Sequence, residues 1–96
     1  MLKKDSKVVA SQNPVSANLV DEIVLLEPDS GMYYSLNVVG SRIWELIQKP
    51  KTVDEIRDVL LAEYEVEPDR CERDLLNLLQ DLVNKDLVEV DGGLDA

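Results

Sequence analysis

Residues 22–36 read EIVLLEPDSGMYYSL and predict a β-hairpin. Residues 22–27 and 32–36 are runs of strand-forming residues, and residues 28–31 between them place proline early and glycine late, as a turn requires. Both predicted strands are apolar on both faces. Because a solvated antiparallel sheet usually has one polar face, we expect either a cover on the second face or an open apolar patch.

Three helices are predicted after the hairpin, and each has a recognisable start. Asn37 can cap the first helix, and Thr52 with Glu55 forms a capping box for the second. Pro68 fits the first turn of the third helix. The third helix carries two apolar rows, which implies two packing neighbours. These rows are Cys71, Leu75, Leu78 and Leu82, and Leu76, Leu79 and Val83.

Two short strands and the chain ends complete the predicted fold. Residues 8–11 predict a weak strand and residues 87–90 a short final one, whereas residues 1–7 and 91–96 are expected to be a flexible N-terminus and a disordered tail. Residues 8–90 would then form a single α+β domain, in which a small N-terminal antiparallel sheet of three strands precedes the three helices. This order is the outline of a winged helix-turn-helix fold.

The chain is strongly acidic, which limits its partners. Ten Lys and Arg against twenty Asp and Glu give a formal net charge of −10. A winged-helix outline suggests DNA binding, but duplex binding depends on several Lys or Arg contacts to phosphate, and the third helix is richer in acidic residues. We therefore expect no nucleic-acid partner. Without a long apolar run or a signal-peptide pattern, a cytoplasmic protein with no membrane partner is expected.

The titratable residues form no recognisable catalytic, metal or cofactor site. Cys71 is the one thiol, it lies on an apolar helix row, and the chain has no histidine to activate it, so we expect a buried and inert side chain. The carboxylates of residues 54–58 and 69–74 have the spacing of exposed helix faces and helix starts. The sequence thus predicts a protein that is not an enzyme and needs no cofactor.

Several segments together resemble a known family. The sequence YSLN at residues 34–37 is followed by IWEL at 43–46, TVDEI at 52–56 and DLLNLLQDL at 74–82, and then by Leu87-Val88. In order and spacing these segments resemble the PqqD family over roughly residues 8–90. The resemblance implies a winged-helix-like recognition element that binds the leader of a ribosomally synthesised, post-translationally modified peptide and does not bind DNA.

The resemblance also implies where a leader would bind. In the family, the leader adds as a strand beside the last strand of the hairpin and lies in a cleft against the third helix. In this chain the strand edge would be residues 32–36, and Arg70, Arg73 and Asp74 would orient polar groups of the leader. The implied peptide-binding residues are Met32, Tyr33, Tyr34, Ser35, Leu36, Arg70, Cys71, Asp74, Leu75 and Leu78.

A separate enzyme is the second partner that the resemblance implies. The chain is most similar to the stand-alone leader-binding protein of lasso-peptide biosynthesis, which presents its precursor to a leader peptidase. The alternative is an accessory protein of pyrroloquinoline-quinone (PQQ) biosynthesis that serves a radical SAM enzyme. Two other classes stay open: an acidic winged-helix regulator, and a homodimerisation module that pairs its strand edge with a second copy. The protein would be a monomer or a weak homodimer.

Overall fold

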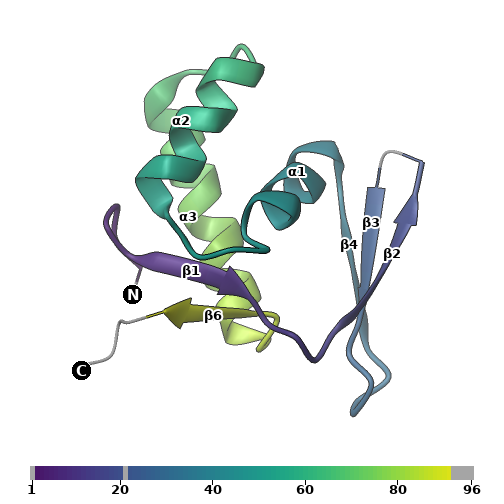
Figure 1. Ribbon diagram of the computed structural model, residues 1–96. Coiled ribbons are helices and arrows are strands. Elements are labelled where there is room, and N and C mark those ends of the chain that lie inside the picture. Colours follow the sequence, from purple (N-terminus) through teal and green to yellow (C-terminus); the bar gives the residue numbers. More distant parts are fainter. Residues whose placement is uncertain (1, 21, 92–96) are drawn as a thin grey trace.

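The computed structural model describes residues 2–20 and 22–91, and its elements confirm the predicted α+β class. Figure 1 shows the helices grouped together, with β2, β3 and β4 standing to one side. The strands are β1 (Lys7–Ala10), β2 (Val15–Leu19), β3 (Glu22–Leu26), β4 (Tyr33–Leu36), β5 (Lys51–Thr52) and β6 (Val88–Asp91), and the helices are α1 (Val38–Leu46), α2 (Val53–Glu63) and α3 (Pro68–Asn84). Residues 92–96 of the predicted tail lie outside the described residues.

The strands form two antiparallel sheets where the sequence predicted one. The terminal sheet has the order β5-β1-β6, and the hairpin sheet has the order β2-β3-β4. The predicted hairpin of β3 and β4 is confirmed, but its third strand is β2, which the sequence analysis missed, and not β1. β2 follows β1 after Asn13-Pro14 and pairs with β3, the next strand in the sequence, as consecutive strands commonly do. β1 pairs with β6, close to the other end of the chain.

All three predicted helix starts are confirmed. Asn37 Oδ1 accepts a hydrogen bond from the Gly40 N–H at 2.8 Å. Thr52 and Glu55 exchange the two hydrogen bonds of a capping box, at 2.9 and 3.1 Å, and Pro68 stands at the start of α3. These caps satisfy N–H groups that the first turn of a helix leaves free. Since Asn37 follows β4 directly, its cap also fixes the corner between the hairpin sheet and α1.

One apolar core joins both sheets to the helices. The hairpin sheet contributes its inward face, where Leu25 and Leu36 are 0% and 2% exposed. Leu2 also belongs to the core, and its backbone N–H donates to the Gln80 side chain at 3.2 Å. The buried apolar residues are Leu2, Val8, Ile23, Leu25, Leu36, Ile43, Trp44, Ile47, Val53, Ile56, Leu60, Cys71, Leu75, Leu79, Leu82, Leu87 and Val88.

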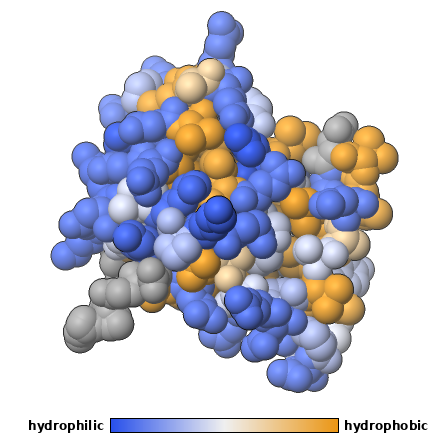
Figure 2. Space-filling view, viewed as in Figure 1, coloured by the Kyte–Doolittle hydropathy of each residue, from blue (hydrophilic) through white to orange (hydrophobic). Residues whose placement is uncertain are grey.

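The outward face of the hairpin sheet is an open apolar patch within the described part of the chain. Cross-strand pairing places Val15, Leu19, Leu26 and Tyr33 on this face, and they are 57%, 55%, 41% and 72% exposed. Figure 2 shows hydrophobic surface over this sheet. No described helix of the chain covers this face, so the cover by helices that the sequence allowed is not observed. None of the described helices is both long enough and apolar enough to cross a bilayer.

Candidate functional site

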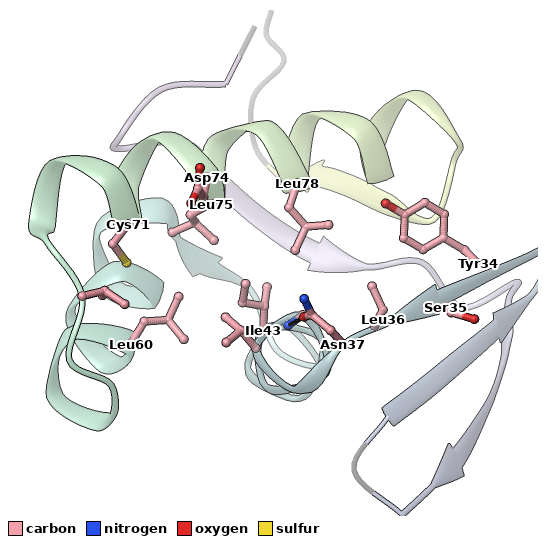
Figure 3. Close-up of a pocket in the computed structure, with 13 residues that line it drawn as sticks. Tyr34, Ser35, Leu36, Asn37, Ile43, Leu60, Cys71, Asp74, Leu75 and Leu78 are labelled. Atoms are coloured by element: carbon pink, nitrogen blue, oxygen red, sulfur yellow. Dashed lines mark hydrogen bonds between the residues drawn. The ribbon is translucent and has the colours of Figure 1, made fainter.

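A groove of about 420 Å³ lies between β4, α1 and α3. Figure 3 shows Leu36 on one side of it and Leu75 and Leu78 on the other, with Tyr34 at one end and Cys71 at the opposite end. Apolar side chains form most of its walls, and a few polar groups stand at its rim. Such a groove fits apolar side chains of a ligand and offers few contacts to a charged one.

β4 forms the open edge of the hairpin sheet beside this groove. Among residues 2–20 and 22–91, no strand pairs with its second side. At the turn between β3 and β4, the Glu27 N–H donates to the Met32 carbonyl at 2.8 Å. Because bonded and non-bonded pairs alternate along an antiparallel ladder, Tyr33 and Ser35 turn their main-chain N–H and C=O groups away from β3. The edge therefore presents the hydrogen-bonding groups of two residues.

A side chain from α1 holds the far end of the β3–β4 pair. Ser41 is 7% exposed, and its Oγ accepts a hydrogen bond from the Ile23 N–H at 2.9 Å and donates one to the Leu36 carbonyl at 3.2 Å. Ile23 and Leu36 lie opposite each other in the ladder. Ser41 therefore links the two groups that a direct ladder bond would join, and it fixes the end of β4 against α1.

Most of the residues that the resemblance implies lie around the groove. The walls differ in what they can offer a ligand: Leu36 and Leu75 are each 2% exposed, whereas Leu78 is half-buried. Leu78 therefore lines the groove and also has surface that a ligand can contact. The implied residues that line the groove are Tyr34, Ser35, Leu36, Cys71, Asp74, Leu75 and Leu78.

The other three implied residues lie elsewhere. Met32 and Tyr33 line a second hollow of about 200 Å³, which Tyr34 separates from the groove. Arg70 lines neither hollow; its side chain is 77% exposed, and its Nε lies 3.7 Å from the Asp74 carboxylate. A contact of Arg70 with a ligand would therefore be made at the rim.

The sequence analysis missed the floor of the groove, which the first turns of α1 supply. A Cβ at Gly40 would lie 3.3 Å from Asn37 Oδ1 and 3.4 Å from Leu36 Cβ, so glycine allows α1 to approach β4 closely. The available sequence signal was Val39, two residues after the Asn37 cap, which the structure shows to be exposed. The missed lining residues are Asn37, Val39, Gly40, Ile43, Leu60 and Val66.

Cys71 is buried, as the sequence predicted. Its side chain is 9% exposed at the end of the groove next to Leu60. Burial raises the pKa of its thiol, and the nearby Arg57 offsets this only in part. The thiolate is the nucleophilic form of cysteine, and the raised pKa disfavours that form of Cys71.

A polar link closes the Tyr34 end of the groove. The Tyr34 hydroxyl donates to Asp81 Oδ2 at 2.8 Å, and Lys85 Nζ donates to Asp81 Oδ1 at 2.8 Å. Burial, followed by the hydrogen bond to Asp81, raises the pKa of Tyr34. The hydrogen bonds from Lys85 and Tyr34 lower the pKa of Asp81. A neutral phenol therefore faces an ionised carboxylate.

The carboxylates of residues 54–58 and that of Glu72 have structural partners. Arg57 on α2 contacts Asp54 and Glu72, each at 3.1 Å, and Asp58 at 3.2 Å. Glu55 belongs to the capping box of α2. In the part of the chain that the structure describes, no group of three or more Cys, Asp or Glu side chains is placed to hold a metal ion.

Solved structures with the same fold include complexes with peptides. This chain is 44% identical to "TbiB1 in Complex with the TbiA(beta) Leader Peptide", over 91% of this chain and 99% of that one, with a TM-score of 0.77. It is 26% identical to "Lasso peptide synthetase B1 complexed with the leader peptide", over 85% and 96% of the two chains, with a TM-score of 0.76.

A third structure shares the fold at lower identity. The PqqD truncation of Methylobacterium extorquens PqqCD is described as a stand-alone recognition element for ribosomally synthesized and post-translationally modified peptides. It is 21% identical over 93% of this chain and 95% of that one, with a TM-score of 0.76. No curated protein is similar enough to this chain to count as a match.

The family assignment rests on the sequence itself. The profile of the family described as coenzyme PQQ synthesis protein D (PqqD) matches residues 22–88. This span begins with β3 and includes β4, α1 and α3, so it contains every element that forms the groove. The resemblance seen in the sequence is confirmed: this chain belongs to the PqqD family.

Proposed function

We propose that the protein captures the leader of a ribosomally synthesised precursor peptide and presents it to a separate maturation enzyme. The observation that carries this proposal is the open edge of β4 beside the apolar groove. An extended peptide that pairs with this edge extends the hairpin sheet by one strand. Its side chains then alternate between the groove and the outward face of the sheet.

Main-chain pairing would supply binding that does not depend on the leader's sequence. Tyr33 and Ser35 each offer one N–H and one C=O to an added strand. Each new hydrogen bond replaces one to water, so its net contribution is about 0.5–1.5 kcal/mol. A leader that is disordered when free also loses conformational entropy on binding. Pairing alone would therefore bind weakly, and affinity in the micromolar to nanomolar range needs apolar side chains as well.

The groove would select among leaders. Burying a Val- or Leu-sized side chain contributes about 1.5–3 kcal/mol, which exceeds the net contribution of one main-chain hydrogen bond. Leu78 and Leu75 on α3 and Leu36 on β4 would contact such side chains from two sides. Arg70 and Asp74, exposed at the rim, would contact polar groups of the leader.

The similar structures support this function and a particular enzyme partner. The 44% and 26% identical chains are each described in complex with a leader peptide, and the second is a lasso peptide synthetase B1. The PqqD truncation is 21% identical. We therefore take a lasso-peptide leader peptidase as the enzyme partner, ahead of the radical enzyme of PQQ biosynthesis.

A binding role without catalysis agrees with the chemistry of the groove. Cys71 is held as the thiol, and the Tyr34 hydroxyl is engaged by a carboxylate that Lys85 also contacts. Asp81, the carboxylate that accepts from the Tyr34 hydroxyl, also accepts from Lys85, and its lowered pKa makes it a weak base. On this proposal, the peptide leaves the groove chemically unchanged and the separate enzyme cleaves it.

The test compares two leucines of α3. Leu76 and Leu78 are both half-buried and both pack against the core, but only Leu78 lines the groove. The labelled TbiA(beta) leader would be titrated against the wild type, Leu78→Asp and Leu76→Asp, with thermal unfolding measured in parallel. We expect similar losses of stability, and a loss of affinity of about 100-fold only for Leu78→Asp.

Equal affinities for the two variants, both folded, would contradict binding in the groove. Size-exclusion chromatography of the same samples addresses the homodimer alternative. A wild-type dimer that the leader does not dissociate would favour pairing of the β4 edge with a second copy.

A further inference from the structure

A single side-chain hydrogen bond connects the hairpin sheet to α3 within residues 2–20 and 22–91. It runs from the Tyr34 hydroxyl to Asp81 Oδ2, between residues 47 positions apart in the chain. The other hydrogen bonds between the hairpin sheet and a helix go to Ser41 on α1. Tyr34 is thus the point at which β4 is tied to the opposite wall of the groove.

Lys85 holds the acceptor of this hydrogen bond in place. Its Nζ donates to Asp81 Oδ1 at 2.8 Å, which leaves Oδ2 directed to the tyrosine. The same Nζ lies 5.6 Å from the centroid of the Tyr34 ring, within the range of a cation–π attraction. Asp81 and Lys85 therefore act on both ends of the Tyr34 side chain, its hydroxyl and its ring face. We name these three side chains the Tyr34 latch.

The Tyr34 ring stands between two hollows, and one of them is large enough to accept it. The groove measures about 420 Å³, whereas a cavity of roughly 150 Å³ holds a benzene molecule. In Figure 3 the ring lies at the end of the groove, next to Leu36 and Leu78. A tyrosine free to rotate about its Cα–Cβ bond would gain apolar contacts by turning inward between these two side chains.

We propose that Asp81 and Lys85 are positioning residues that keep the Tyr34 ring out of the groove, so that the groove stays open for the side chains of an incoming peptide. The inference rests on the proposed function, because it concerns the same groove. The inference gives a role to Asp81 and Lys85, which lie outside β4 and do not line the groove. Without the latch, the ring fills the groove, and a peptide must displace it before binding.

A purely structural role for the same hydrogen bond makes a different prediction. If Asp81 only tied the sheet to α3, its loss would lower stability and affinity together and would leave the ring where it is. If the Tyr34 latch holds the ring, removing the latch moves the ring into the groove. The affinity for the leader then falls by more than the loss of folding stability explains. The position of the ring in the free protein separates the two.

The experiment uses the full chain and the TbiA(beta) leader as the probe. The variants are Asp81→Ala, which removes the acceptor, Asp81→Asn, which keeps an acceptor oxygen, and Tyr34→Phe, which removes the donor. Asn77→Ala, an exposed change one turn earlier on α3, is the control. Affinity is measured by titration, and the ring is located in the free protein by NMR contacts between its protons and the methyl groups of Ile43 and Leu75.

We expect Asp81→Ala and Tyr34→Phe each to weaken binding about tenfold, because each breaks a hydrogen bond to a charged group. The double variant should be no weaker than either single one, since both remove the same link. New contacts from the ring to Ile43 and Leu75 should appear in both. Asp81→Asn has one neutral acceptor oxygen for two donors, so its affinity should lie between those of Asp81→Ala and the wild type. Asn77→Ala should resemble the wild type.

Wild-type affinity in folded Asp81→Ala, or a ring that stays in place when affinity falls, would overturn the latch. A wild type that fails to bind the leader would contradict the proposed function instead. In that case the position of the Tyr34 ring in the free Asp81→Ala variant still tests the proposed role of the Tyr34 latch, because the ring contacts are measured without a peptide.

Discussion

The two sheets of this protein are attached to its helices in different ways. The terminal sheet and the residue before it are tied by main-chain hydrogen bonds, from the Ala10 N–H to the Ile47 carbonyl at the end of α1 at 2.8 Å and from the Val53 N–H at the start of α2 to the Ser6 carbonyl at 3.0 Å. The hairpin sheet is tied to them by hydrogen bonds of the Ser41 and Asp81 side chains in the described residues. The first sheet holds the chain together near both ends, and the second keeps one edge open. We therefore propose that the terminal sheet mainly stabilises the fold and that the hairpin sheet binds the leader.

A charge in the centre of the terminal sheet should break the fold. Val8 is 0% exposed and lies on the strand between β5 and β6. Val8→Asp places a carboxylate there without a partner, and we expect a loss of more than about 4 kcal/mol in the free energy of unfolding. Circular dichroism should show no cooperative thermal transition. A variant that melts like the wild type would mean that the terminal sheet does not hold the fold.

A proline at the open edge should affect binding but not folding. The Ser35 N–H faces away from β3, so Ser35→Pro removes a donor that no other strand of residues 2–20 and 22–91 uses, and proline is tolerated on edge strands. We expect leader affinity to fall about tenfold because a hydrogen bond and close pairing are lost. Ser35→Ala keeps the N–H and should bind normally. Equal affinity of the two variants in titrations would argue against strand addition.

Salt should slow the encounter with a partner. Residues 8–41, which include the hairpin sheet, contain no Lys or Arg, and the whole chain carries a formal net charge of −10. A basic partner is therefore attracted over a distance that salt shortens. Raising the ionic strength from about 0.05 to 0.5 M should lower the association rate several-fold and change the dissociation rate little. Stopped-flow mixing with the partner enzyme measures both, and an unchanged association rate would exclude electrostatic steering.

The smallest effect concerns the junction of the terminal sheet with α2. The hydrogen bond from the Thr52 N–H lowers the pKa of Glu55 below its usual 4.5. A lowered folded-state pKa means that ionised Glu55 stabilises the fold above this pH and that the contribution is lost as the pH falls through the folded-state pKa. Glu55→Gln removes the titration, so the stability difference from the wild type should shrink below about pH 4.5. A difference that stays constant from pH 7 to pH 3 would contradict this role.

Local signals in the sequence were sufficient for the hairpin and the three helix starts. The turn at residues 28–31, the caps at Asn37 and Thr52 and the proline at position 68 each act within a few residues, so their chemistry can be recognised without a structure. β2 had a signal that was overlooked, because Val15, Ala17 and Leu19 alternate with polar residues. Its position after Asn13-Pro14 makes it look like a loop.

The division into two sheets could not be predicted from local patterns. β1 pairs with β6 and with the two-residue β5, which are distant in sequence, and nothing near residues 7–10 specifies those partners. The groove shows the same limit. Its β4 edge and α3 wall followed from the family resemblance, whereas its floor depends on how closely α1 approaches β4 at Gly40. The bond between Tyr34 and Asp81 likewise joins two positions that no sequence pattern connects.

Amide hydrogen exchange at Tyr33 and Ser35 tests strand addition at β4 most directly. Their N–H groups face the open side of the sheet, so we predict fast exchange in the free protein. Saturation with the TbiA(beta) leader should protect both amides strongly, while Tyr34, already paired with β3, changes little. Leader binding that leaves Tyr33 and Ser35 exchanging as fast as before would show that the peptide does not pair with this edge.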